Sequence, residues 1–219
     1  MHNSVQKYKD IISAIDRKIE EQKIISSPKV IAVSKTFGLE KILPLIEHGH
    51  LDYGENKVQE AIDKWSDIKL KNQDIKLHLI GKLQTNKVKH AIKLFDYIHS
   101  VDSIKLAKKI SDEQIRQNKN VKLFIQVNIG NEDQKSGVKI DEIDELIIFS
   151  KQFNLNIIGL MCIPPANEEP DKYFKQMKFL SKKFNLLETS MGMSSDYLKA
   201  VENSSTYLRI GSSIFGARN

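Results

Sequence analysis

Residues 121–163 read VKLFIQVNIGNEDQKSGVKIDEIDELIIFSKQFNLNIIGLMCI, and they hold one full repeat of the pattern that runs through the chain. The runs at 121–128 and 157–163 are largely apolar along their length, which is typical of strands that are covered on both faces. Between them, residues 140–152 carry apolar side chains at helical spacing. A buried strand, a helix and a second buried strand predict two parallel strands joined by a helical crossover.

The same alternation extends along the whole chain in both directions. Strands are expected at 29–34, 51–54, 77–81, 97–101, 121–128, 157–163, 186–191 and 207–211. Helices are expected at 2–25, 39–48, 56–67, 86–95, 103–117, 140–152, 171–184 and 195–203. This α/β pattern predicts a closed (β/α)₈ barrel of the TIM type with an extra N-terminal helix, as one domain over residues 1–219. A doubly wound open sheet is the alternative, but no G-x-G-x-x-G follows the first strand.

The composition excludes several classes of protein. The chain has 219 residues, 40% of them hydrophobic and 28% charged, which is the balance of a globular domain. Cys162 is the one cysteine, so neither an intramolecular disulfide nor a cysteine-based zinc cage can form, and we expect no metal site. No apolar run approaches the roughly 20 residues that cross a bilayer. The first residues do not resemble a signal peptide, so a cytoplasmic location without membrane contact is expected.

The charge pattern argues against nucleic acid as a partner. Lysine and arginine total 34 and aspartate and glutamate 28, which gives a net charge of +6. Most of the basic residues are scattered lysines, whereas bidentate recognition of phosphates and bases prefers arginine. The pattern therefore indicates a solvated, lysine-rich surface. A nucleic-acid binder is kept as an alternative, for which retention on heparin with a steep salt dependence is the test.

Lys35 is the first candidate for chemistry, because function in such barrels lies where the strands end. It follows an apolar strand and is expected to project into the mouth of the barrel. Partial burial lowers the pKa of a lysine amine, and the neutral amine is the form that attacks a carbonyl carbon. The structural alternative is a lysine whose amine simply reaches solvent at the end of a strand.

Two small loops near the end of the chain are candidates for binding a phosphate group. Residues 191–195 form an expected glycine turn, with Ser194 as the N-cap of the helix near 195–203. Gly211 and Ser212 follow the last strand, and phosphate sites in these barrels often lie after strands 7 and 8. Tight turns with capping serines are the alternative for each loop taken alone.

Arg209 lies within the last apolar strand and needs a partner there, either a buried carboxylate or a ligand. A lysine, a phosphate site and an internal arginine together suggest pyridoxal 5′-phosphate (PLP) as the cofactor. An arginine beside the pyridine nitrogen would disfavour protonation of the ring. The ring would then be a weaker electron sink, and carbanion chemistry would be damped.

Short motifs in a fixed order carry a resemblance to a known family. They are AVSKT at 32–36, GEN at 54–56, VQE at 58–60, His78 with Ile80 and Gly81, LQ at 83–84, NK at 86–87, SVD at 100–102, QVN at 126–128, KSG at 135–137, GLM at 159–161, SMGMS at 190–194, RIG at 209–211, IFG at 214–216 and Arg218. The chain resembles the pyridoxal phosphate homeostasis protein family, whose barrel is that of the alanine racemase N-terminal domain. Leu77 and Leu79 depart from the pattern, since aromatic residues usually flank this histidine.

The resemblance implies a cofactor site and a role. Lys35 would be the Schiff-base lysine that holds PLP as an internal aldimine, and Arg209 would face the ring nitrogen. Ser194, Gly211 and Ser212 match the phosphate positions. The remaining matches, with less defined roles at the mouth, are Asn56, His78, Asn86 and Met161. The family's role is to bind, buffer and deliver PLP, with PLP-dependent apoenzymes as partners and a monomer or weak dimer as the assembly, and no catalytic residues are implied.

A PLP-dependent enzyme of the amino-acid racemase type is the alternative. Racemases of this fold resemble two-domain proteins whose second domain supplies a tyrosine, and we expect no second domain here because the last strand ends close to the C-terminus. Proton transfer on two faces also needs a second acid–base group, and Tyr53 is the one tyrosine near a strand end. A cofactor-free aldolase that uses Lys35 is a further alternative, which predicts a colourless protein.

Overall fold

A closed barrel of eight parallel strands in chain order forms the centre of the computed structural model, which describes residues 2–217. The strands are β1 (Lys29–Val33), β2 (Asp52–Glu55), β3 (Lys76–Leu79), β4 (Tyr97–Val101), β5 (Lys122–Val127), β6 (Ile157–Cys162), β7 (Glu188–Met193) and β8 (Tyr207–Ile210). β8 pairs with β1 and closes the barrel. The predicted (β/α)₈ barrel is therefore confirmed. Arg218 of the last motif lies outside the described residues.

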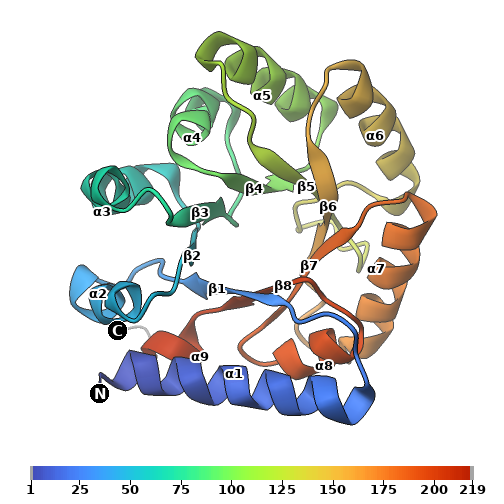
Figure 1. The fold of residues 1–219 in the computed structure, drawn as a ribbon. Coiled ribbons are helices and arrows are strands. Elements are labelled where there is room, and N and C mark those ends of the chain that lie inside the picture. The colour runs from blue at the N-terminus through green and yellow to red at the C-terminus, as the bar shows by residue number, and fades with distance from the viewer. Residues whose placement is uncertain (1, 218–219) are drawn as a thin grey trace.

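Helices surround the barrel on its outer side (Figure 1). They are α1 (Asn3–Gln22), α2 (Leu39–Glu47), α3 (Val58–Lys71), α4 (Val88–Leu94), α5 (Ile104–Gln117), α6 (Ile143–Gln152), α7 (Asp171–Lys183), α8 (Tyr197–Glu202) and α9 (Ser212–Phe215). Short 3₁₀ turns, Thr85–Lys87 and Ile140–Glu142, precede α4 and α6. The extra N-terminal helix, α1, packs against α2, α8 and α9 through one apolar face. No helix within residues 2–217 has the length and hydropathy that crossing a membrane requires.

The end of β7 differs from the prediction. The strand continues to Met193, with Gly192 at a φ of +92° and a shift of register in the pairing with β8 between Ser190 and Met193. A Cβ on Gly192 would lie 2.5 Å from the Cβ of Ala200, so this close approach of β7 to α8 requires glycine. The prediction of Ser194 as an N-cap is wrong: α8 begins at Tyr197, and its N-cap is Asp196. The Asp196 carboxylate instead accepts a hydrogen bond of 2.6 Å from the Met193 amide.

The interior of the barrel is filled where the strands begin and along their middle. Buried apolar side chains from five strands pack there against one another: Ile31, Tyr97, Phe124, Met161 and Tyr207. Two buried histidine rings stack among them, His78 on Tyr97 and His99 on Phe124, with centroids 4.2 Å apart in each pair. The barrel is therefore a packed core rather than a pore, and its open pocket lies where the strands end.

Candidate functional site

A pocket of about 310 Å³ lies at the carboxyl ends of β1, β2, β3, β6, β7 and β8. Six of the nine predicted site residues line it: Lys35, Asn56, Ser194, Arg209, Gly211 and Ser212. Parallel strands in a closed barrel all end on the same side, which is why residues from positions 35 to 212 meet in one place. The apolar part of the wall was not predicted and consists of side chains at or near strand ends: Val33, Ile80, Ile163 and Met193. Their position at the end of an apolar run was the signal in the sequence that could have identified them.

His78 and Met161 lie elsewhere. Both are fully buried in the barrel interior, His78 on β3 and Met161 on β6, and neither lines the pocket. Asn86 lies in a separate surface groove beside α5, together with three lysines of that helix. His78, Met161 and Asn86 therefore match the family motifs but do not belong to the pocket wall.

Lys35 is held by a turn that is fixed on both sides. Thr36 has a φ of +65°, and its amide donates to Oε1 of Glu60 at 2.6 Å. Nζ of Lys64 donates to the Ser34 carbonyl at 2.9 Å and to Oε1 of Glu60 at 3.0 Å. Burial acts to raise the pKa of Glu60, but these two donors outweigh it and the pKa lies below its usual value. The residues before and after Lys35 are thus both tied to α3.

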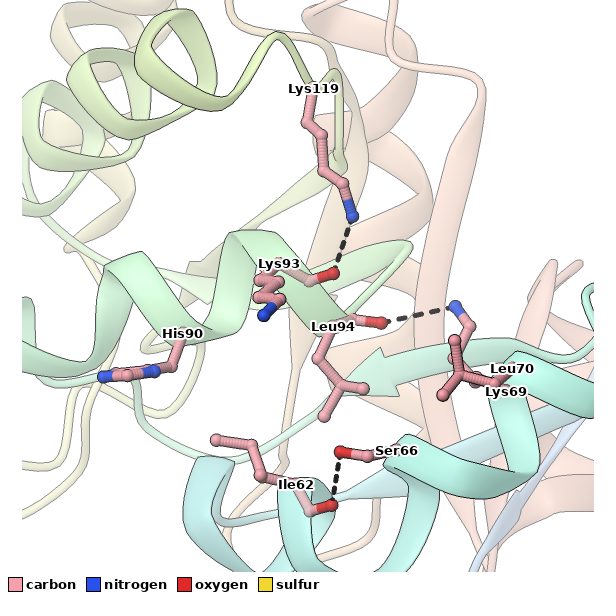
Figure 2. A pocket seen from close by; sticks show the side chains of 8 residues that line it. All are labelled: Ile62, Ser66, Lys69, Leu70, His90, Lys93, Leu94 and Lys119. Carbon is pink, nitrogen blue, oxygen red and sulfur yellow. Dashed lines mark hydrogen bonds between the residues drawn. The ribbon is translucent and has the colours of Figure 1, made fainter.

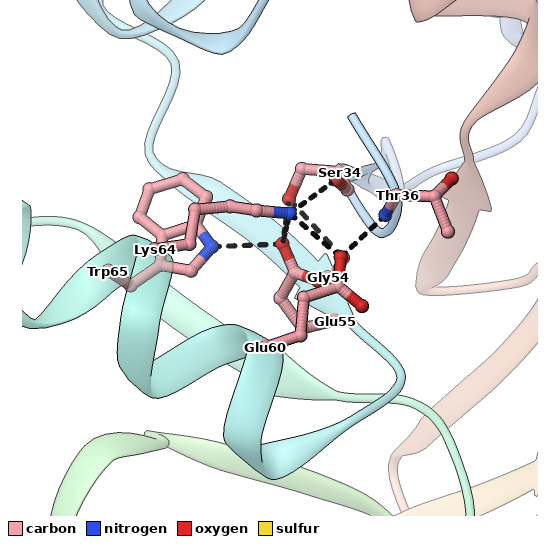
Figure 3. Close-up of polar contacts among 7 residues, drawn as sticks. All are labelled: Ser34, Thr36, Gly54, Glu55, Glu60, Lys64 and Trp65. Carbon is pink, nitrogen blue, oxygen red and sulfur yellow. Dashed lines mark hydrogen bonds and ion pairs between the residues drawn. The ribbon is translucent and has the colours of Figure 1, made fainter. Parts of the chain in front are cut away.

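Glu55 lies beneath this turn, and sequence reasoning did not single it out for a role. Its side chain is fully buried between β2 and α3. Oε1 accepts hydrogen bonds from Ser34 Oγ at 2.8 Å, Lys64 Nζ at 2.9 Å and Trp65 Nε1 at 2.9 Å. Figure 3 shows these donors converging from α3 and from the end of β1. A buried carboxylate needs such a cation, so Lys64 compensates Glu55 while it holds the Lys35 turn.

Arg209 forms the inner end of the pocket. It is 4% exposed, and it donates to Ser190 Oγ at 2.7 Å and to the Cys162 carbonyl at 2.8 Å. Both acceptors are neutral, so neither cancels the charge of the guanidinium. Burial lowers the pKa of Arg209, but arginine keeps its proton in proteins. Burial also raises the pKa of the Cys162 thiol to about 12, which leaves that thiol unreactive.

Ser194 and Gly211 line the pocket and form, with the amide of Ser213, a polar corner of its wall. Ser194 Oγ accepts hydrogen bonds of 3.3 Å from the amides of Gly211 and Ser213. Gly211 also allows the chain to pass close to β1, because an added Cβ would lie 3.2 Å from the Val33 carbonyl oxygen. Converging amides and hydroxyls of this kind suit an anionic oxygen group.

Comparison with known proteins places this barrel in a family. The family model described as alanine racemase, N-terminal domain, matches residues 12–219. A pyridoxal phosphate homeostasis protein of Aquifex aeolicus (strain VF5) is 38% identical over 200 residues, which cover 87% of this chain and 87% of that protein. The chain belongs to the pyridoxal phosphate homeostasis protein family. The resemblance stated from the motifs is thereby confirmed.

Solved structures agree with membership of the pyridoxal phosphate homeostasis family. PipY of Synechococcus elongatus PCC7942 without PLP superposes with a TM-score of 0.82 at 33% identity and covers 92% of this chain and 100% of that chain. The structure of PipY with PLP bound gives a TM-score of 0.79 at 31% identity, with the same coverage. Alanine racemase of Clostridium difficile 630 is 16% identical with a TM-score of 0.74, and this chain covers 56% of it, so it shares the fold alone.

A second pocket in this pyridoxal phosphate homeostasis family member lies between α3 and α4, outside the barrel. It measures about 390 Å³, and its rim carries Lys69, Lys93, Lys119 and His90 (Figure 2). Lys119 donates to the Lys93 carbonyl at 2.6 Å, and Lys69 donates to the Leu94 carbonyl at 3.3 Å. These carbonyls end α4, where backbone acceptors lack helical partners. The two lysines therefore cap a helix, and the pocket is not the candidate site.

Proposed function

We propose that this protein binds PLP in the pocket at the carboxyl ends of the strands and holds the cofactor for delivery within the cytoplasm. The observation that carries the proposal is one pocket lined by Lys35, by Arg209 and by the polar corner at Ser194 and Gly211. A relative that is 38% identical carries the name pyridoxal phosphate homeostasis protein, and a 31% identical relative has PLP bound. Both support the same cofactor here.

The pocket residues fit the parts of PLP. PLP supplies an aldehyde that condenses with an amine, and Lys35 is the amine of the pocket wall. The corner at Ser194, Gly211 and Ser213 offers a hydroxyl and two amides to the phosphate. Apolar side chains, Val33, Ile80 and Ile163 among them, would cover the faces of the ring. We assign direct contacts to the six lining residues and not to His78 or Met161.

Arg209 favours holding the cofactor over chemistry on it. A guanidinium beside the ring nitrogen keeps that nitrogen unprotonated, because two adjacent cations repel each other. Among the described residues that line the pocket, Lys35 and Arg209 are the ionisable ones, and the guanidinium keeps its proton, so this wall holds no second acid–base group. Racemisation needs acid–base groups on two faces. Storage and delivery to PLP-dependent apoenzymes, by a monomer or weak dimer, is the function that such a wall supports best.

The test is a titration of the purified protein with PLP, followed by absorbance, borohydride reduction and peptide mapping. Wild type should develop the visible band of protein-bound PLP, with the reduced adduct on Lys35. Lys35→Ala should lack the band while its circular dichroism stays unchanged. The exposed Lys57 supplies the control, and Lys57→Ala should behave as wild type. An adduct spread over surface lysines would contradict the proposal.

A second measurement separates the carrier from the racemase. The loaded protein is mixed with an apoenzyme that requires PLP, and recovery of that enzyme's activity is followed, with L-alanine chirality monitored in parallel. The proposal expects recovery of activity and no loss of chirality. Steady racemisation that disappears in Lys35→Ala would make the protein an enzyme instead.

A further inference from the structure

A continuous chain of hydrogen bonds crosses the interior of the barrel and ends at Arg209. Asp52 Oδ1 lies 2.9 Å from His78 Nε2, and His78 Nδ1 lies 3.0 Å from His99 Nε2. His99 Nδ1 lies 2.9 Å from Ser190 Oγ, which accepts the 2.7 Å bond from Arg209 Nη1. The five residues come from β2, β3, β4, β7 and β8, so the chain runs from side to side through the core.

The two ends of this hydrogen-bond chain and the neutral state of its two histidines together fix the direction of every bond. A guanidinium only donates and an ionised carboxylate only accepts, so Arg209 donates to Ser190 and His78 donates from Nε2 to Asp52. A neutral His78 that donates from Nε2 must accept at Nδ1, so His99 donates to it from Nε2. A neutral His99 then accepts at Nδ1, and Ser190 is its donor. Both rings carry their proton on Nε2 in this assignment.

The surroundings of the two rings favour that neutral state. Both histidines are fully buried and stacked on aromatic rings, and burial lowers the pKa of each below its ordinary value. The ionisable groups that act on His78 are Asp52, Asp96 and Lys29, and those that act on His99 are His78 and Arg209. Burial opposes ionisation of Asp52 as well, but its bond from His78 outweighs this and its pKa lies below the ordinary value. The chain therefore joins a carboxylate to a guanidinium through neutral groups.

We infer that Asp52, His78, His99 and Ser190 are positioning residues for Arg209, and that they couple the cofactor pocket to the opposite end of the barrel. Asp52 is the solvent-facing end of the chain: its side chain is 21% exposed and lines a cleft of about 400 Å³ beside Lys29 and His50. The negative charge of Asp52 orients each donor of the hydrogen-bond chain toward Asp52. Ser190 then donates its proton to His99, and a lone pair of Ser190 Oγ faces Arg209. The effect on the cofactor rests on the proposed function, whereas the chain of hydrogen bonds within the barrel does not.

The first test uses the protein without PLP, so its result depends on the chain of hydrogen bonds and not on cofactor binding. Protein labelled with ¹⁵N in histidine is studied by long-range ¹H–¹⁵N correlation near neutral pH. Both His78 and His99 should be neutral with the proton on Nε2, and Nδ1 should show the shift of a hydrogen-bond acceptor. A cationic ring, or a proton on Nδ1 of either residue, would overturn the inference.

The second test asks whether the charge of Asp52 affects His99, which lies further along the chain of hydrogen bonds. Asp52→Asn keeps an acceptor oxygen but removes the charge, and it should shift the ring signals of His99, which Asp52 does not contact. The control is Asp74→Asn, an exposed carboxylate on the loop before β3, which should shift neither ring. Unchanged His99 signals in Asp52→Asn would contradict the coupling.

The third test addresses the cofactor. Ser190→Ala leaves Arg209 Nη1 without its acceptor and should weaken PLP binding by about tenfold, with an altered absorbance maximum of the bound form. If wild type binds PLP but Ser190→Ala has the same spectrum and affinity, the positioning role fails. If wild type does not bind PLP while the histidine tautomers are as expected, the proposed function fails and the hydrogen-bond chain stands.

Discussion

Ser194 Oγ lies 3.3 Å from the backbone nitrogen of Gly211, and this hydrogen bond joins the loop after β7 to the end of β8. The same hydroxyl accepts from the Ser213 amide at 3.3 Å. Two amides therefore point at one position in the wall of the pocket. An anionic oxygen that entered this corner would accept hydrogen bonds from the same groups, with the serine hydroxyl free to turn and donate.

Replacing Ser194 should reveal which part of the ligand occupies this corner. Ser194→Ala is expected to weaken PLP binding by about tenfold, because a charge-assisted hydrogen bond is lost. Binding of pyridoxal, which lacks the phosphate, should be almost unchanged. Ser213→Ala is the matched control, since it keeps the amide and removes a hydroxyl outside the pocket wall. Equal losses for PLP and pyridoxal would mean that the phosphate lies elsewhere. Equilibrium titration by absorbance gives both affinities.

Lys64 should be important for stability as well as for the Lys35 turn. Lys64→Met leaves the buried carboxylate of Glu55 without its cation, and we expect the free energy of unfolding to fall by about 3 kcal/mol. Urea unfolding followed by Trp65 fluorescence measures the change. Lys175→Met removes a lysine from an exposed ion pair with Asp171 and should have little effect.

The double variant Glu55→Gln with Lys64→Met provides the complementary measurement. Removing both charges should restore part of the stability that Lys64→Met loses, because no unpaired buried charge remains. Additive losses in this cycle would show that the two side chains do not act as a pair.

Gly81 limits the space available to Asn56 in the pocket. An added Cβ at Gly81 would lie 2.3 Å from the Asn56 carbonyl oxygen and 2.8 Å from its Cα, so the backbone of Asn56 must move in Gly81→Ala. Such overpacking is expected to lower the free energy of unfolding by about 1–3 kcal/mol. It should also weaken PLP binding, which a titration will detect. Lys82→Ala, at the adjacent residue, should leave both quantities near wild type. A normal PLP affinity in Gly81→Ala would show that binding does not depend on the position of the Asn56 backbone.

The fold and much of the pocket could be predicted because both depend on patterns that are local in sequence. Apolar runs such as 157–163 alternate with amphipathic segments, and a parallel barrel follows from that alternation. The carboxyl ends of parallel strands then meet, which places Lys35 near Arg209 without knowledge of any contact. The roles proposed for these residues stay predictions until the PLP titration is done.

Other features depend on tertiary contacts that no local pattern contains. The N-cap assigned to Ser194 is wrong because β7 runs to Met193 and α8 begins at Tyr197, and the proximity of Ala200 that requires glycine at position 192 is visible only in the fold. The pairing of Glu55 with Lys64 needs the exact placement of α3 on β2. The bond between His99 and Ser190 joins residues 91 positions apart, and side chains that point into a barrel carry no such signal in the sequence.

His50 should make the stability of the protein depend on pH. Its ring lies in the cleft beside Tyr8, its Nε2 donates to the Asp52 carbonyl at 2.8 Å, and burial lowers its pKa from 6.5 to about 4. As the pH falls, the unfolded chain takes up a proton at this histidine first, so stability is complete above pH 6.5 and is lost toward pH 4. Between pH 7 and pH 5 the contribution of His50 should fall by about 2 kcal/mol, in addition to the contributions of His78 and His99, whose pKa is lowered as well. His50→Gln can still donate to the carbonyl but cannot titrate, so its urea midpoint should change less across this range, whereas His48→Gln, on the same turn but exposed, should follow wild type. If His50→Gln and wild type have the same slope, the His50 ring takes up its proton equally in the folded protein, and the cleft beside Asp52 must then be open to water.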